Sequence, residues 1–118
     1  MLENMVNKSF MDVKDVLDFC NEEIASYKQS FKDKDSRIFF EKLKRYMDDC
    51  RNSLYALGGI IKDPHEPMKD VSDTKEYKDF SDACKELIWA LMRGKNNKDS
   101  YSKKVGGLFG FVAKNLEK

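Results

Sequence analysis

Apolar side chains recur at alternating spacings of three and four residues along three stretches of this chain. The three stripes consist of Phe10, Val13, Leu17, Cys20, Ile24, Tyr27 and Phe31, then Phe40, Leu43, Met47, Cys50, Leu54, Leu57 and Ile61, then Tyr77, Phe80, Cys84, Leu87 and Leu91. Because an α-helix completes a turn every 3.6 residues, residues spaced in this way lie on one side of a helix. Each stripe therefore predicts a helix with one buried side and one solvated side.

The first two stripes predict an antiparallel helical hairpin. The first helix is expected to begin at a Ser9 cap and to end at Phe31. A charged turn of about four residues follows, and Asp35 or Ser36 is expected to cap a second helix that ends near Ile61. Helices joined by so short a turn pack as antiparallel neighbours.

A proline-bearing loop separates this hairpin from the third predicted helix. Pro64 and Pro67 exclude a continuous helix through residues 63–72. Asp73 with Glu76 has the spacing of a capping box, and this predicts a third helix from there to Arg93. The glycine that follows Arg93 is the residue type that most often ends a helix.

A fourth helix is expected after Ser100, which is its predicted cap. One apolar face is formed by Tyr101, Val105, Leu108, Phe109, Val112 and Leu116. Gly106, Gly107 and Gly110 interrupt this segment, and each costs up to about 1 kcal/mol relative to alanine. Packing against the other helices must therefore support the fourth helix.

The fold class that follows is all-α. Residues 1–118 are expected to form one domain, an antiparallel up-down-up-down four-helix bundle with three long helices and a short glycine-containing fourth. The predicted core consists of the three stripes together with Ile88, Val105, Leu108 and Val112.

Charge distribution and cysteine content restrict the cellular compartment that the sequence predicts. The net charge of the 118 residues is +1, but residues 92–118 carry about +5 and residues 1–91 about −4. The three cysteines lie on core stripes, which predicts buried free thiols in a reducing compartment. A turn near residue 34 brings Cys20 opposite Met47 or Cys50, so these two thiols are either neighbouring core side chains or a redox-sensitive pair. With no apolar leader and no long apolar run, we expect a soluble, cytoplasmic protein.

The residues of catalytic and metal sites are missing from this pattern. A di-iron bundle needs inward glutamates and Glu-x-x-His pairs, whereas every inward position here is uncharged. The single histidine, His65, lies between two prolines, and neither Cys-x-x-Cys nor His-Glu-x-x-His occurs. We therefore expect no enzyme activity, no cofactor, no metal and no small-molecule substrate.

Two aromatic residues lie away from the predicted core. From 100° per residue, Trp89 lies about 160° and Phe19 about 130° from the centre of their stripes. They either pack against the fourth helix or a loop, or anchor a partner, because exposed aromatic residues concentrate at binding hot spots.

The C-terminal segment supplies the other candidate residues for partner binding. They are Lys103, Lys104, Phe109, Phe111 and Lys114. The segment is either a short closing helix or a mobile one that docks on a protein partner or a membrane surface. Lys103 and Lys104, together with Arg93, Lys95 and Lys98 and with Tyr101 among them, are also a small cluster of the kind that neutralises phosphates in nucleic acid.

The function expected from these features is protein–protein contact without catalysis, as an adaptor, inhibitor or immunity-type protein. Self-association as a dimer, nucleic-acid binding through the basic C-terminal segment, and peripheral membrane contact are the alternatives. In size, charge and helix count the chain resembles bacteriocin immunity proteins, the small helical subunits of RNA-guided effector complexes, and phage-encoded inhibitors. This resemblance is one of architecture, without shared motif residues.

Overall fold

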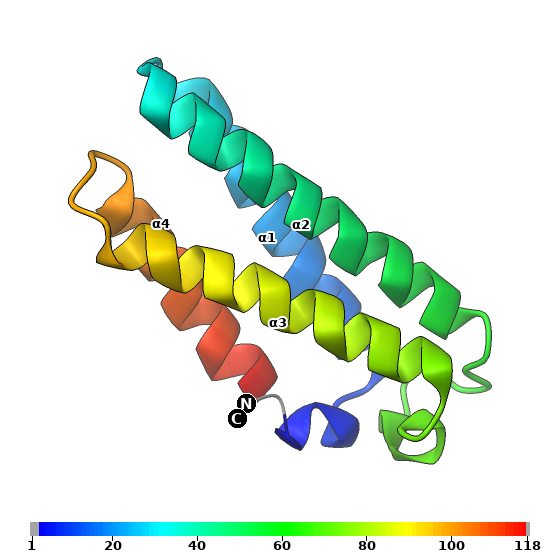
Figure 1. Ribbon diagram of the computed structural model, residues 1–118. Coiled ribbons are helices and arrows are strands. Elements are labelled where there is room, and N and C mark those ends of the chain that lie inside the picture. Colours follow the sequence, from blue (N-terminus) through cyan, green and yellow to red (C-terminus); the bar gives the residue numbers. More distant parts are fainter. Residues whose placement is uncertain (1–2, 118) are drawn as a thin grey trace.

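The computed structural model describes residues 3–117, which form helices that alternate in direction (Figure 1). In chain order the elements are the 3₁₀ turn η1 (Glu3–Asn7), α1 (Phe10–Ser30), α2 (Lys34–Gly58), the 3₁₀ turn η2 (Met68–Val71), α3 (Lys75–Asn96), α4 (Ser102–Val112) and the π-helical turn η3 (Ala113–Glu117). The all-α up-down-up-down bundle with three long helices and a short fourth is confirmed.

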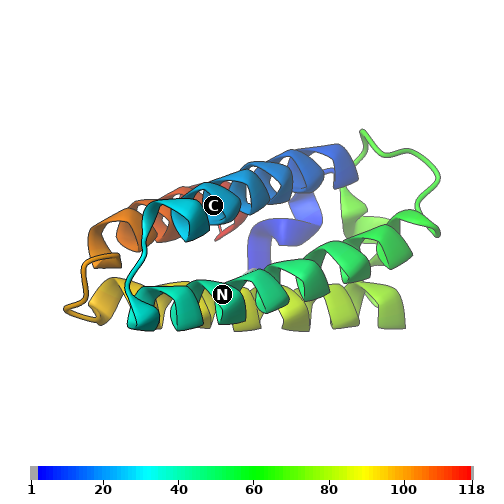
Figure 2. The same ribbon diagram turned by 90° about the horizontal axis from the view of Figure 1, so that it is seen from above.

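The four helices form two layers. Figure 2 shows α1 and α4 in one layer and α2 and α3 in the other. Consecutive helices are the main packing partners, and the bundle measures 44 × 23 × 20 Å. Because α4 is short, η1 and η3 contact each other below it, and Met5 of η1 is fully buried. The sequence pattern did not predict this turn.

The predicted core is largely confirmed. Buried apolar side chains from all four helices make one cluster, and every predicted core residue is either buried or packed against that cluster. Phe10, Tyr27, Phe31 and Ile61 are the partly buried members. Met5, Met68 and Ala90 are buried residues that the stripes did not include.

Phe40 is the centre of an aromatic cluster at the end of the bundle where the α1–α2 and α3–α4 loops lie. Its ring centroid lies 6.0 Å from that of Tyr27, 5.6 Å from Phe31, and 5.5 Å from both Phe39 and Tyr101. Rings from α1, α2 and the residue preceding α4 therefore pack together and hold this end closed.

Three predicted N-caps are wrong by one to three residues. Asp33, not Asp35 or Ser36, caps α2, and its carboxylate accepts hydrogen bonds from the Ser36 amide at 2.9 Å and the Ser36 hydroxyl at 2.6 Å. Thr74 rather than Asp73 caps α3, because its hydroxyl oxygen accepts the Tyr77 amide at 3.2 Å. The N-cap of α4 is Tyr101 and not Ser100, with no side-chain cap bond. The Ser9 cap of α1 is confirmed.

Gly94 does not end α3, which continues to Asn96. A Cβ at position 94 would lie 2.9 Å from Cε2 of Phe39 and 3.0 Å from Cγ1 of Val105. Glycine is therefore present because α2 and α4 approach the backbone of α3 at this point, and not because the helix turns there.

Candidate functional site

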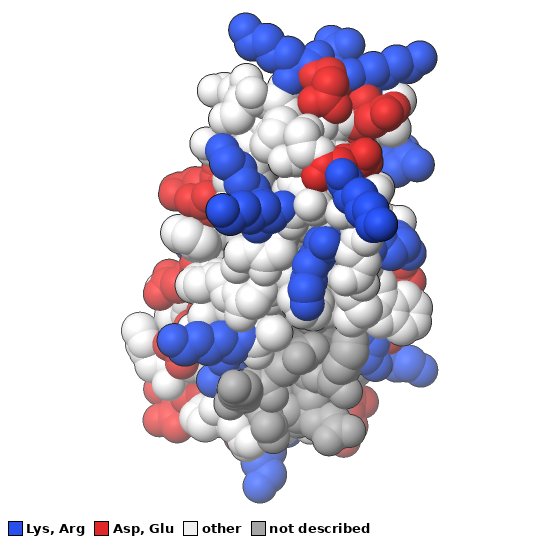
Figure 3. Space-filling model, turned by 90° about the vertical axis from the view of Figure 1, so that its left-hand side faces the viewer, with Lys and Arg blue, Asp and Glu red and all other residues white. Residues whose placement is uncertain are grey.

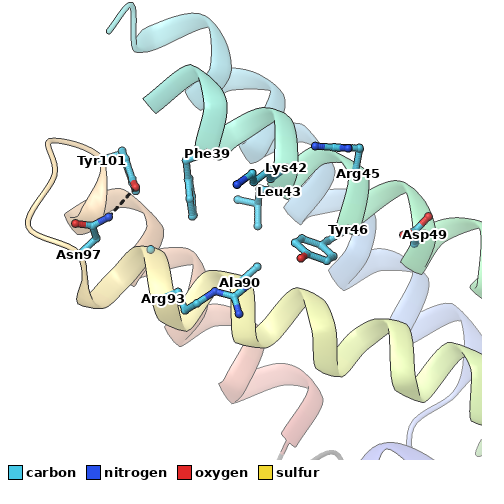
Figure 4. Close-up of a pocket in the computed structure, with 11 residues that line it drawn as sticks. Phe39, Lys42, Leu43, Arg45, Tyr46, Asp49, Ala90, Arg93, Asn97 and Tyr101 are labelled. Atoms are coloured by element: carbon cyan, nitrogen blue, oxygen red, sulfur yellow. Dashed lines mark hydrogen bonds between the residues drawn. The ribbon is translucent and has the colours of Figure 1, made fainter. Parts of the chain in front are cut away.

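A groove of about 580 Å³ lies between α2 and α3 (Figure 4). This volume is within the range of pockets that hold a small ligand or a side chain. The groove is lined by Phe39, Lys42, Leu43, Arg45, Tyr46 and Asp49 on α2, by Ala90, Arg93 and Gly94 on α3, and by Asn97 and Tyr101 beyond it. The sequence pattern predicts none of these residues as partner-binding residues, although Arg93 and Tyr101 belong to the basic cluster of the C-terminal segment.

Aromatic side chains from α2 face small residues on α3 across this groove. Phe39 and Tyr46 stand on α2, whereas α3 offers Ala90 and Gly94, one turn apart and both buried. Side chains four residues apart lie on the same face of a helix, so α3 presents only small residues at these two positions of the groove. Gly94 thus admits the ring of Phe39 against α3, and Ala90 leaves the groove open farther along.

Tyr101 fixes one end of the groove. Its ring stacks on Phe39 with centroids 4.4 Å apart and planes 13° from parallel. The Asn97 side-chain amide donates a hydrogen bond of 3.2 Å to the Tyr101 hydroxyl (Figure 4). Burial, followed by the hydrogen bond and charge of Asp99, raises the pKa of Tyr101, which therefore stays protonated at neutral pH.

Three cations border the groove. Lys42 and Arg45 on α2 and Arg93 on α3 are exposed, and Asp49 is the one acidic residue among the lining residues. The ion pairs among the described residues are Lys14–Asp18, Lys44–Asp48, Arg51–Asp18 and Lys75–Asp79. The three cations at the groove are therefore without an ion-pair partner in the described part of the chain.

This excess of positive charge extends over the whole end of the bundle. Residues 23–45 and 90–109, which make up that end, carry twelve Lys and Arg and five Asp and Glu, a net charge of +7. The rest of the chain carries −6. Figure 3 shows lysine and arginine side chains crowded at this end and part-way down the visible face. Although the net charge is close to zero, positive and negative charges are therefore strongly separated along the molecule.

Trp89 is 51% exposed on α3, directly before Ala90 in sequence but outside the lining of the groove. Its ring is thus available to solvent. Phe19 of α1 is 43% exposed, and its ring centroid lies 4.5 Å from that of Phe111 on α4. The structure brings these two predicted residues together, and it leaves Trp89 on a different helix.

The C-terminal segment is packed onto the bundle. Val105, Leu108, Val112 and Leu116 are buried. Lys104 Nζ lies 5.6 Å from the ring centroid of Tyr27 and 5.5 Å from that of Phe31, and Lys95 Nζ lies 4.8 Å from the ring of Phe109. Two of the predicted partner-binding residues, Lys104 and Phe109, are therefore engaged in cation–π contacts within the molecule. Lys103 and Lys114 are exposed.

The three thiols converge in the middle of the bundle. Cys20, Cys50 and Cys84 are buried and free, and Cys50 Sγ donates to the Ala83 carbonyl oxygen at 3.1 Å. Burial, with a smaller contribution from the neighbouring Cys50, raises the pKa of the Cys20 thiol to about 12. A hydrogen bond with Cys50, followed by burial, raises the pKa of Cys84. Thiols held protonated in this way are poor nucleophiles, so they act as packing groups.

Features of other kinds of site are absent from the described residues. No group of three or more His, Cys, Asp and Glu side chains in residues 3–117 is arranged to hold a metal ion. None of the helices in that range combines the length and apolar composition needed to cross a bilayer. His65 is exposed in the loop after α2, where its backbone amide donates to Asp63 Oδ1 at 2.9 Å.

Comparison with known proteins adds no relative. No family model, no curated protein and no solved structure matches this chain. The candidate site therefore depends on its own geometry, which is that of a binding groove with aromatic walls and a cationic border.

The sequence did contain a signal for this groove. Phe39 and Tyr46 each directly precede a core residue of the second stripe, and Ala90 and Gly94 flank the core residue Leu91. Aromatic residues beside one stripe and small residues beside another indicate a widened interface between two helices. Gly94 also has the residue type of a helix stop, and with that interpretation positions 90 and 94 do not belong to the same helix face.

Proposed function

We propose that this protein is a non-enzymatic binding protein that recognises an acidic segment of a protein partner through the basic end of its bundle. The observation that carries the proposal is the α2–α3 groove, where Lys42, Arg45 and Arg93 border aromatic walls without ion-pair partners among the described residues. Exposed cations in this arrangement favour a carboxylate-bearing ligand.

An adaptor, inhibitor or immunity-type role agrees with this mode of binding. Each works by occupying a surface of another protein, and none needs a catalytic group. A cytoplasmic location is part of the proposal, and the three free, buried thiols support it because reduced cysteines are typical of that compartment. The proposed contact surface is the groove, whereas the sequence pattern favoured Trp89 and the C-terminal helix. Trp89 is exposed enough to lie at the edge of a large interface.

Binding to nucleic acid is the competing explanation of the basic end. A net charge of +7 over residues 23–45 and 90–109 attracts phosphates as well as carboxylates. The aromatic rings at this end are mostly turned into the cluster around Phe40, which leaves few ring faces for stacking on bases. We therefore favour an acidic protein segment.

Membrane contact and self-association have less support from the geometry. The apolar face of α4 is buried, so a membrane-surface role would require α4 to leave the bundle. The large exposed apolar residues are Phe19, Ile38, Tyr55, Ile60 and Trp89. They are distributed over three helices and the turn after α2, not gathered in a single patch of the kind that dimer interfaces use.

The test compares two triple charge reversals. One carries Lys42→Glu, Arg45→Glu and Arg93→Glu at the groove; the other carries Lys62→Glu, Lys69→Glu and Lys78→Glu, which are exposed lysines outside the basic end. Both variants lower the net charge equally. Fluorescence anisotropy measures their affinity for a labelled twelve-residue peptide of glutamate, serine and glycine, and for a single-stranded DNA of the same charge.

We expect the groove variant to bind the acidic peptide at least tenfold more weakly than the natural protein, and the control variant to bind it within a factor of about three. Equal losses in the two variants, or no binding of the peptide at all, would refute the proposal. Tighter binding of the DNA than of the peptide, lost in the groove variant, would establish nucleic-acid binding in its place.

A further inference from the structure

We infer that the α2–α3 groove is a socket for one aromatic side chain of the acidic segment, with the flanking carboxylates held by Lys42, Arg45 and Arg93. This inference rests on the proposed function and adds the chemical nature of the residue that is recognised. The border cations and the size of the groove are separate features. Three border cations account for the capture of carboxylates, but they do not require the cavity of about 580 Å³ that lies between them.

The walls of the groove are suited to an aromatic ring. Phe39 and Tyr46 on α2 are half-buried lining residues, Tyr101 is 3% exposed and closes one end, and the buried Leu43 and Ala90 lie at the bottom. Because Phe39 and Tyr101 already stack on each other with centroids 4.4 Å apart, the wall available to a further ring is Tyr46, which is half-buried and belongs to no aromatic pair among the described residues. Aromatic pairs gain about 0.5–1.5 kcal/mol beyond the area that they bury.

The depth of the groove is set by the small residues of α3. At position 90 an alanine occupies a place on the core side of the helix where a larger residue would fill the gap to α2, whereas the space over Gly94 is taken by the ring of Phe39. Ala90 is 4% exposed and Gly94 is buried, so neither residue contributes a contact of its own to a ligand. Ala90 leaves room in the groove, and Gly94 lets the ring of Phe39 lie close against α3.

The polar groups around the groove fit the same occupant. Arg93 is the border cation on α3, and a guanidinium group stacks on an aromatic ring as well as binding a carboxylate. The hydroxyl of Tyr101 accepts from Asn97 and is hydrogen-bonded to Asp99, so it holds the end of the groove in place and leaves the carboxylates of the ligand to the cations. A segment with an aromatic residue between two acidic residues would use both the walls and the border at once.

The experiment uses the natural position of tryptophan in this chain. Trp89 is the single tryptophan and lies outside the groove, so Trp89→Phe removes the protein's own tryptophan signal without changing a lining residue. A tryptophan placed in the middle of the acidic peptide then reports its own burial by fluorescence. The same peptide with alanine in place of tryptophan, and one with leucine, complete the set.

We expect the tryptophan peptide to bind at least tenfold more tightly than the alanine peptide, with a blue shift of its emission on binding. The leucine peptide should lie between them. Filling the groove with Ala90→Leu should reduce the preference for the tryptophan peptide over the alanine peptide to less than about twofold. Because Ala90→Leu adds bulk at a buried position and can alter packing, Tyr46→Ala, which removes one wall at a half-buried position, provides a second test of the same preference.

The outcomes separate this inference from the proposed function. If the three acidic peptides bind equally and the tryptophan emission does not shift, the socket is wrong, and charge recognition at the basic end stands. If none of the acidic peptides binds, the proposed function fails, and the socket fails with it. If a tryptophan peptide without acidic residues binds as tightly as the acidic one, the groove is an aromatic site and the role assigned to the cations is refuted.

Discussion

Gly94 lies where Phe39 of α2 and Val105 of α4 both press against the backbone of α3. We predict that Gly94→Ala destabilises the protein by about 1–3 kcal/mol, because the added methyl group overlaps the Phe39 ring and that ring is held by its stack on Tyr101. The free energy of unfolding in urea, followed by circular dichroism, measures the effect.

Gly107 is the matched control for this substitution. It is exposed on α4, and a Cβ there would meet nothing within 4 Å. Alanine is a better helix former than glycine, so Gly107→Ala should stabilise the protein by up to about 1 kcal/mol. The same sign of change in both variants would show that helix propensity, and not the close approach of Phe39, governs position 94.

At the scale of the helices, the packing of α1 and α3 around the thiols of Cys20 and Cys84 makes the free energy of unfolding depend on pH. An unfolded chain ionises a thiol near pH 9, whereas the pKa of Cys20 in the folded protein is about 12. The protonated thiol is therefore favoured by folding. Its contribution is fully present below pH 9 and is lost as the pH rises from 9 towards 12.

We predict that the free energy of unfolding falls between about pH 9 and 12, and that Cys20→Ala reduces the slope. One thiol contributes at most about 1.4 kcal/mol per pH unit. Tyr27, whose pKa burial and then Glu23 raise to about 12, titrates in the same range; Cys20 makes only the smallest contribution to that pKa, so most of the Tyr27 effect is common to both proteins and cancels in the difference. An unchanged slope in Cys20→Ala would mean that the thiol ionises as readily in the folded protein as in the unfolded one.

Prediction from sequence succeeded for the helices and failed for their ends. The stripes place the core because the burial of apolar area is the largest favourable contribution to folding, and on a helix it follows the period of the turn. The N-caps depend on which of several adjacent polar residues turns its oxygen towards the free amides. Asp33, Asp35 and Ser36 are all chemically suitable, and Asp73 and Thr74 compete in the same way. Spacing alone does not decide among such neighbours.

The groove escaped prediction for a different reason. It results from the rotation of α2 relative to α3, which places Phe39 and Tyr46 opposite Gly94 and Ala90. A stripe defines which side of each helix is buried. It does not define the rotation of each helix about its axis, and this rotation decides which residues at the borders of the two stripes face each other. The pairing of Phe19 with Phe111 across α1 and α4 is another product of this rotation.

The whole molecule is an elongated body, 44 Å long, with about +7 at one end and −6 over the rest. At about 0.01 M salt the Debye length is roughly 30 Å, so the basic end of one copy attracts the acidic region of another. At about 0.15 M the Debye length falls to roughly 8 Å, and this attraction is screened. A net charge of only +1 provides little opposing repulsion.

We therefore predict that the second virial coefficient from static light scattering is negative at low salt and rises as salt is added. The two triple charge reversals separate polarity from total charge, because both bring the net charge to −5. The groove variant reduces the basic end to +1 and should lose the attraction, whereas the control variant keeps the +7 end opposite a region of −12 and should retain more of it. Attraction that persists or grows with salt would instead indicate apolar self-association through residues such as Trp89 and Phe19, and the exposed aromatic residues would then be a dimer surface.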